Sequence, residues 1–194
     1  MTAPSLLAIF VGGKSRRMGE HKGLLSIPGS SEPIVEALVR RGRESGFEPV
    51  LVGEATPYAR LAEGVLRLDD DPPGAGPLAG LHAALRHALK THRSQLVAIG
   101  CDMPFVSAEA LAAARDHRSR AIVVAPKRAA DAPWEPMLAR YDAAGLVDPL
   151  AEAISRGETS FQRLFASIEV EALPLSEAVE RALEDWDRPE DLVR

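Results

Sequence analysis

Residues 6–11 form a continuous apolar run, Leu-Leu-Ala-Ile-Phe-Val, without any alternation of apolar and polar positions. Two glycines, Gly12 and Gly13, follow it directly. A short run of this kind predicts a β-strand that is buried on both faces, which is typical of a parallel sheet covered by helices on each side. The start of the chain therefore indicates an α/β architecture.

The same alternation of short buried strands and helices continues along the chain. Further strands are expected at 49–52, 96–100 and 121–125, and helices at 33–45, 78–89 and 108–117. After Pro126 we expect a strand at 135–141, helices at 143–156 and 160–165, a strand at 168–173 and a short terminal helix at 189–193. Such βαβ units predict an α/β fold of three layers (αβα), with a mostly parallel, Rossmann-like sheet.

The length of 194 residues, 46% of them hydrophobic, suits one domain with a sizeable core. We expect a single domain over 1–194. The pattern changes after Pro126, which divides the domain into an N-terminal part, about 1–125, and a C-terminal part, about 126–194.

The composition excludes several classes of protein. The net charge of −5 argues against a general nucleic-acid-binding protein, which must neutralise many phosphates. One cysteine, Cys101, permits no intrachain disulfide and makes a thiolate zinc site improbable. The first apolar run is too short for a signal peptide or a membrane span. We therefore expect a cytoplasmic protein that contacts neither nucleic acid nor membrane.

The loop after the first strand concentrates positive charge. Four permanent cations lie within nine residues: Lys14, Arg16, Arg17 and Lys22. Gly12 and Gly13 allow a sharp turn whose backbone N–H groups can face an anion. The spacing matches neither the Walker A loop nor the dinucleotide-binding Gly-x-Gly-x-x-Gly. A solvated basic turn is the alternative, but the position directly after a buried strand favours a triphosphate site.

Two groups of aspartates are candidates for the same crevice. Asp102 follows the strand at 96–100 and could bind Mg²⁺ together with phosphate oxygens and water, or could simply cap a turn before Pro104. Asp69, Asp70 and Asp71 precede a Gly/Pro-rich loop and the start of a helix. They could form a solvated loop or part of a nucleotide site.

Three motifs together resemble the molybdenum cofactor guanylyltransferases, members of the nucleotidyltransferase superfamily. They are Gly-Gly-x-Ser-x-Arg-Met-Gly-x-x-Lys from Gly12 to Lys22, Gly-Pro-Leu-Ala-Gly-Leu from Gly76 to Leu81, and Cys-Asp-Met-Pro at 101–104. A late Asp-Arg-Pro-Glu-Asp-Leu, from Asp187 to Leu192, is similar to the family's terminal motif. The resemblance covers nearly the whole chain and implies the nucleotidyltransferase fold.

The resemblance implies a reaction and a set of site residues, with nucleotide binding in the N-terminal part, about 1–125, and acceptor binding in the C-terminal part, about 126–194. The reaction is Mg²⁺-dependent transfer of GMP from GTP to the molybdenum–molybdopterin cofactor, with release of pyrophosphate. Lys22 would bind GTP phosphates, Arg17 would stabilise pyrophosphate, and Asp102 would hold Mg²⁺; these three would be the catalytic residues. The remaining nucleotide-binding residues would be Phe10, Val11, Gly12, Gly13, Asp69 and Gly80.

The chain departs from the family pattern at three places. Phe10 and Val11 stand where the family has Leu-Ala before the two glycines, a change that leaves their backbone role intact. Gly53 stands where the family has an asparagine after the second strand. Asp185 and Asp187 stand where the family has amides near the acceptor, so acceptor binding would involve two acids. Partners would be GTP, the molybdopterin cofactor, and possible molybdenum-insertion proteins and target molybdoenzymes. The alternatives are a cytidylyl- or sugar-nucleotidyltransferase of the same fold and a non-catalytic protein that delivers the cofactor.

Overall fold

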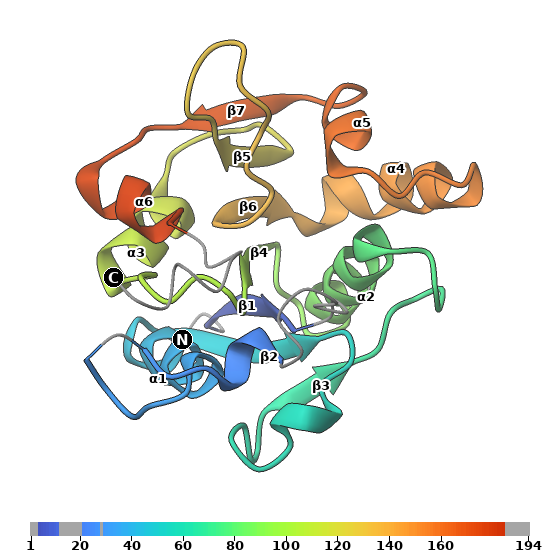
Figure 1. Ribbon diagram of the computed structural model, residues 1–194. Coiled ribbons are helices and arrows are strands. Elements are labelled where there is room, and N and C mark those ends of the chain that lie inside the picture. Colours follow the sequence, from blue (N-terminus) through green and yellow to red (C-terminus); the bar gives the residue numbers. More distant parts are fainter. Residues whose placement is uncertain (1–3, 12–20, 28, 185–194) are drawn as a thin grey trace.

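A single sheet runs through the protein. The computed structural model describes residues 4–11, 21–27 and 29–184. Seven strands lie in the order β3-β2-β1-β4-β6-β5-β7 within this part of the chain (Figure 1). Their bounds are β1 Ser5–Phe10, β2 Phe47–Val52, β3 Leu66–Leu68, β4 Gln95–Gly100, β5 Val123–Pro126, β6 Ala139–Asp142 and β7 Val170–Leu173.

The sheet is parallel except for β6. Strands β1, β2, β3 and β4 all pair in parallel, with Ile9 opposite both Leu51 and Ile99. Strand β6 lies antiparallel between β4 and β5, and β7 pairs in parallel with β5. The mostly parallel sheet expected from the sequence is confirmed, and the strands of the two expected parts of the chain share it.

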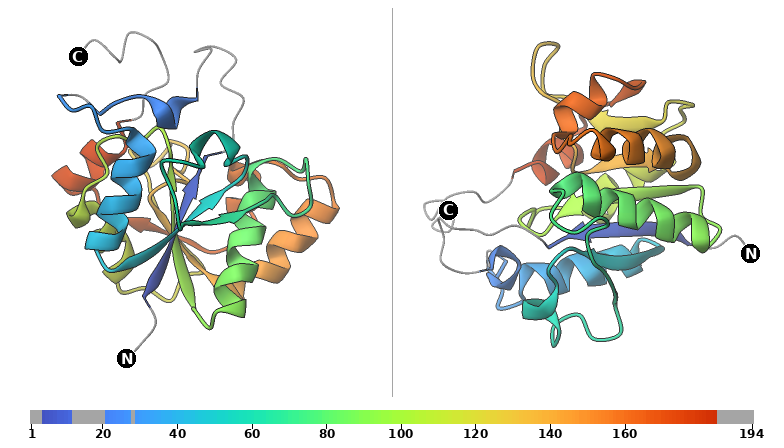
Figure 2. Two further views of the ribbon diagram at one scale, coloured as in Figure 1. Left: turned by 90° about the horizontal axis from the view of Figure 1, so that it is seen from below. Right: turned by 90° about the vertical axis from the view of Figure 1, so that its right-hand side faces the viewer.

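Helices cover both faces of the sheet. Helices α1 (Ile34–Glu44), α3 (Ala108–Asp116) and α6 (Glu177–Ala182) cover one face, and α2 (Pro77–Lys90), α4 (Ala143–Ser155) and α5 (Phe161–Phe165) cover the other (Figures 1 and 2). Each side has its own apolar core. Leu7, Ile9 and Val97 face α1 and α3, whereas Leu6, Ala8 and Leu96 face α2 and α4. This three-layer α/β fold confirms the sequence-based expectation.

The expected elements differ from the observed ones mainly at their ends. The strand expected at 135–141 begins only at Ala139, and the one expected at 168–173 begins at Val170. Strand β3 and helix α6 were not expected, nor were the 3₁₀ turns η1 (Lys22–Leu24) and η2 (Thr56–Tyr58). The helix expected at 189–193 lies outside the described residues. In the described part of the chain, no helix is both long and apolar enough to span a membrane.

Candidate nucleotide site

Four parallel strands end at one edge of the sheet, where ligands of open α/β sheets bind. Hydrogen bonds continue beyond the strand ends: Val11 N–H donates to the Val52 carbonyl over 3.0 Å, and Cys101 N–H to the Phe10 carbonyl over 3.0 Å. The segments that leave β1, β2 and β4 are therefore held side by side. The Val11 amide is occupied by this bond, so it is not available to a ligand.

Lys22 and Asp102 meet at this edge. The Lys22 ammonium lies 3.1 Å from Oδ2 of Asp102, and their side chains are 17% and 29% exposed. Lys22 opens the turn η1, and Asp102 follows β4. The structure thus brings together two of the residues that the sequence predicts for phosphate and metal binding. Both groups remain partly open to solvent, as a ligand requires.

A packed support fixes the backbone next to Lys22. The ring of Tyr58, which is 1% exposed, packs against Gly23: a Cβ at position 23 would lie 2.8 Å from Cε1 of Tyr58 and 3.3 Å from Cβ of Cys101. The His21 ring meets Tyr58 edge-on at 5.9 Å. Only a residue without a side chain fits between these groups, so Tyr58 and Cys101 set the position of the turn.

Tyr58 and Cys101 are neutral near physiological pH. Burial raises the pKa of the Cys101 thiol to about 12, and the charge of Asp102 adds to the effect. Burial also raises the pKa of the Tyr58 hydroxyl, with a smaller contribution from Cys101. A thiol with so high a pKa supplies almost no thiolate, so Cys101 is not a nucleophile here. Sequence reasoning missed Tyr58 because no motif marks it.

Asp70, rather than Asp69, lies against the start of α2. A Cβ at Gly80 would lie 3.1 Å from Oδ1 of Asp70, 2.8 Å from Cγ1 of Val52 and 3.1 Å from Cε1 of Phe10. Asp69 is exposed and lines a separate hollow with Arg67. Side chains alternate along an extended chain, so Asp70, two residues after Leu68, lies on the same face as Leu68, the face toward α2. That alternation was the signal that could have identified Asp70.

Gly80 allows α2 to lie close to the sheet. Its absent side chain leaves room for Val52, Phe10 and Asp70 at once. The Phe10 side chain also packs in the core under α2. The expected role of Gly80 in nucleotide binding stays a prediction, and close packing of α2 is the role that its contacts indicate.

A magnesium ion fits the donors at this edge, although no cluster of three His, Cys, Asp or Glu side chains occurs among the described residues. Asp102 offers one partly exposed carboxylate beside the Lys22 ammonium. Mg²⁺ commonly takes one or two carboxylates and completes its shell with phosphate oxygens and water. Such an ion would depend on the bound triphosphate as much as on the protein.

The remaining predicted site residues fall outside this part of the chain. Gly12, Gly13 and Arg17 lie in 12–20, and Asp185 and Asp187 lie in 185–194; neither segment is among the described residues. Their expected roles stay predictions. Gly53 donates its N–H to the Leu68 carbonyl over 2.9 Å and links the ends of β2 and β3.

Comparison with known proteins identifies the family. Residues 7–172 match the model of the MobA-like NTP transferase domain, which spans nearly all of the sheet. The chain belongs to this family. The protein is thus a nucleotidyltransferase, and the predicted resemblance to molybdenum cofactor guanylyltransferases is confirmed.

Individual relatives agree with the family match. The chain is 33% identical over 196 residues to a "probable molybdenum cofactor guanylyltransferase" from Opitutus terrae, covering 96% of this chain and 92% of that protein. It is 29% identical over 168 residues to a molybdenum cofactor guanylyltransferase from Pseudomonas fluorescens, covering 85% of this chain and 80% of that one.

The solved structures extend the likeness to three dimensions. Molybdopterin-guanine dinucleotide biosynthesis protein A from Archaeoglobus fulgidus superposes with a TM-score of 0.77 at 26% identity, over 97% of this chain and 95% of that one. A cytidylyltransferase acting on 2-C-methyl-D-erythritol 4-phosphate, from Thermus thermophilus, superposes with a TM-score of 0.65 at 18% identity, over 96% and 94%. The second likeness shows the shared fold alone.

Proposed function

We propose that this protein transfers GMP from GTP to the molybdenum–molybdopterin cofactor, in a Mg²⁺-dependent reaction that releases pyrophosphate. The names of its relatives support the substrates. The single structural observation that carries the proposal is the 3.1 Å pair of Lys22 and Asp102 at the carboxyl edge of the sheet. It sets a phosphate-binding cation beside a carboxylate suited to a metal.

The protein acts in this reaction chiefly by positioning two anions. An acceptor phosphate attacks the α-phosphorus of GTP in line with the leaving pyrophosphate. Lys22 binds the triphosphate, and Arg17 and the amides of Gly12 and Gly13 neutralise the leaving group. Mg²⁺ on Asp102, when bound, would neutralise further phosphate charge. No general base is needed because the acceptor phosphate is already ionised, which agrees with the neutral state of Cys101 and Tyr58.

The nucleoside would lie toward the start of α2. Phe10 and Val11 would contribute backbone atoms other than the Val11 N–H, which is bonded to the Val52 carbonyl. Asp69 or its neighbour Asp70 would contact the nucleotide. Asp70 is favoured by its place beside Gly80, whereas the Asp69 side chain is exposed. Substituting each by asparagine and measuring GTP affinity separates them: the residue that binds the nucleotide is the one whose loss raises the dissociation constant.

The acceptor end of the site is assigned to the C-terminal part of the chain. Asp185 and Asp187 would lie near the molybdopterin, where two acids need a metal or Arg188 to offset their charge. Target molybdoenzymes would receive the product. Like the reaction itself, these assignments follow from the resemblance.

A pyrophosphate-release assay with GTP, Mg²⁺ and the molybdenum cofactor tests the proposal. The wild-type chain should release pyrophosphate. Asp102→Asn should reduce the rate by roughly 100-fold or more, since it would weaken the binding of the Mg²⁺ ion whose charge stabilises the transferring phosphate. Asp116→Asn, an exposed aspartate on α3, is the matched control and should keep the wild-type rate. Near-normal turnover of Asp102→Asn would remove Asp102 from the metal site.

The same assay separates the alternatives. Release from CTP instead of GTP would indicate a cytidylyltransferase, whose fold the protein shares. Nucleotide or cofactor binding without any pyrophosphate release would indicate a delivery protein. Omission of Mg²⁺ should stop the reaction, and full activity in the presence of a chelator would contradict metal dependence.

A further inference from the structure

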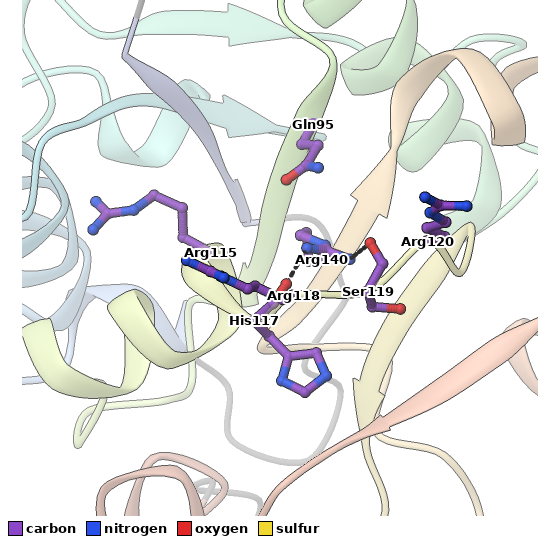
Figure 3. A pocket seen from close by; sticks show the side chains of 7 residues that line it. All are labelled: Gln95, Arg115, His117, Arg118, Ser119, Arg120 and Arg140. Atoms are coloured by element: carbon purple, nitrogen blue, oxygen red, sulfur yellow. Dashed lines mark hydrogen bonds between the residues drawn. The ribbon is translucent and has the colours of Figure 1, made fainter.

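A cationic pocket of about 610 Å³ lies at the opposite edge of the sheet, away from Lys22 and Asp102. It is formed where β4 begins, beside β6 and the loop that follows α3. Strand β4 separates it from the candidate nucleotide site by roughly 20 Å, at about 3.3 Å per residue. We call it the arginine pocket; its lining residues are Gln95, Arg115, His117, Arg118, Ser119, Arg120 and Arg140 (Figure 3).

A buried arginine holds the loop of this pocket in place. Arg140 is only 5% exposed and is the one buried charged residue in the described part of the chain. Its guanidinium donates to the His117 carbonyl over 2.6 Å and to the Ser119 carbonyl over 3.4 Å. These bonds tie residues 117–119 to β6, so the loop presents its side chains from a fixed backbone.

Glu171 on β7 fixes the loop from the other side. Its Oε1 lies 2.7 Å from Nε2 of His117, and its Oε2 accepts a hydrogen bond of 2.6 Å from the Ser119 hydroxyl. Both carboxylate oxygens of Glu171 are thereby engaged by His117 and Ser119. The loop is held at both of these residues, with Arg118 between them.

The positive charge of the pocket is only partly neutralised by the protein. Arg115 pairs with Asp116 at 2.7 Å, and Glu171 attracts Arg140. The exposed side chains of Arg118 and Arg120 form no ion pair or hydrogen bond with the described residues. In the view of Figure 3 they lie on either side of Arg140. The positive charge is therefore local to this pocket, since the chain as a whole has a net charge of −5.

We propose that the arginine pocket binds a linear oligophosphate, either inorganic or the polyphosphate arm of a nucleotide. Guanidinium groups match phosphate oxygens by paired hydrogen bonds, and arginine is the usual residue for this recognition. No aliphatic, Phe, Tyr or Trp side chain lines the pocket, so charge carries the recognition. The spread of Arg118 and Arg120 on either side of Arg140 suits an extended anion with several charges. The proposal is independent of the catalytic activity proposed above.

Calorimetric titration with tripolyphosphate tests the pocket. Every protein in the series carries Lys22→Ala, which weakens phosphate binding at the candidate nucleotide site. Arg118→Gln/Arg120→Gln should weaken tripolyphosphate binding by about tenfold or more, as expected for the loss of two charge-assisted contacts. The control Arg156→Gln/Arg163→Gln removes the same charge from exposed positions at and beyond the end of α4 and should change the affinity little. Both arginines of the pocket variant are exposed, so its melting temperature should equal that of its parent.

The outcomes separate a built site from general charge attraction. Undetectable binding, binding unchanged in the pocket variant, or an equal loss in the control would each overturn the proposal. If GTP and ATP compete with tripolyphosphate, the ligand is the arm of a nucleotide; if they do not, it is inorganic. With Lys22 restored, the pocket variant should keep the wild-type rate of pyrophosphate release, since its arginines lie at the far edge of the sheet.

Discussion

Lys22 and Asp102 form an ion pair of 3.1 Å although they are 80 positions apart in the chain. One belongs to the turn after β1 and the other follows β4, and the two strands are neighbours in the sheet. Parallel pairing places both strand ends at the same edge, and so it places the two charges together. The pair therefore depends directly on the topology of the sheet.

This pair is expected to serve ligand binding more than stability. A partly exposed ion pair usually contributes less than about 1 kcal/mol. In a double-mutant cycle of Lys22→Ala and Asp102→Ala, the coupling in the free energy of unfolding should stay below about 1 kcal/mol. Lys22→Ala should meanwhile raise the dissociation constant of GTP by about tenfold or more, since a charge-assisted contact is lost. A large stability coupling with unchanged GTP affinity would make the pair structural instead.

Gly23→Ala should disturb both stability and nucleotide binding. The new methyl group would lie 2.8 Å from the buried ring of Tyr58, so either the ring or the turn that carries Lys22 must move. Overpacking of this kind costs about 1–3 kcal/mol. Thermal unfolding and GTP titration measure the two effects. In the double variant Gly23→Ala/Tyr58→Leu, the smaller leucine side chain relieves the clash. Its loss of stability should therefore be smaller than the sum of the losses in the two single variants. If the losses simply add, the proposed contact between positions 23 and 58 is wrong.

Asp70→Asn should stabilise the ligand-free protein at pH 7. Burial, and secondarily the charge of Asp69, raises the pKa of the Asp70 carboxyl, so its charged form is disfavoured in the folded state. That penalty is fully present above the raised pKa and disappears as the pH falls toward the unfolded value of about 3.9. The melting temperature of Asp70→Asn should therefore exceed that of the wild type at pH 7 and converge with it in acid.

The exposed neighbour provides the control for Asp70. Asp69→Asn removes only an exposed charge that repels the Asp70 carboxylate. It should therefore raise the melting temperature less than Asp70→Asn does. Equal melting temperatures of Asp70→Asn and wild type at pH 7 would show that Asp70 has no such penalty. A gain that persists unchanged at pH 3 would point to a cause other than ionisation.

Gly80→Ala should destabilise the protein even though alanine is the better helix former. The propensity gain is about 1 kcal/mol, whereas a methyl group 2.8 Å from Val52 and 3.1 Å from Phe10 overpacks the core at a cost of about 1–3 kcal/mol. Chemical denaturation gives the balance. Ala83→Gly, at a half-buried position of the same helix, measures the propensity part alone. A more stable Gly80→Ala would mean that α2 can move away from the sheet.

The sequence was sufficient to predict the elements that carry long apolar runs. Residues 6–11 and 96–100 are apolar because both faces of β1 and β4 are covered, and that pattern is local. Strand β3, by contrast, has three residues, two of them exposed, at the edge of the sheet. Helix α6 has six residues. Neither is long enough for its periodicity to stand out.

The candidate site divides in the same way. That Lys22 and Asp102 share an edge follows from strand polarity, which the βαβ pattern reveals. The choice between Asp69 and Asp70 depends on the pleat of β3, a strand that was not foreseen. Tyr58 contacts Gly23 from a short turn 35 positions away in the chain, and only tertiary packing brings them together. The position of β6 between β4 and β5 likewise cannot be predicted from the sequence of any one of these strands.

The antiparallel strand β6 determines whether the chain can be cut into an N-terminal and a C-terminal fragment. Residues 4–125 contain β1 to β4 and all the described residues of the candidate nucleotide site, yet one side of β4 is closed only by β6. A fragment that ends at 125 would leave unpaired the amides and carbonyls on the side of β4 that faces β6, and such an open edge invites association with other chains. A chimera of two relatives that joins the N-terminal part of one to the C-terminal part of the other at residue 125 should therefore fold poorly. A working chimera would need β4 and β6 from the same parent.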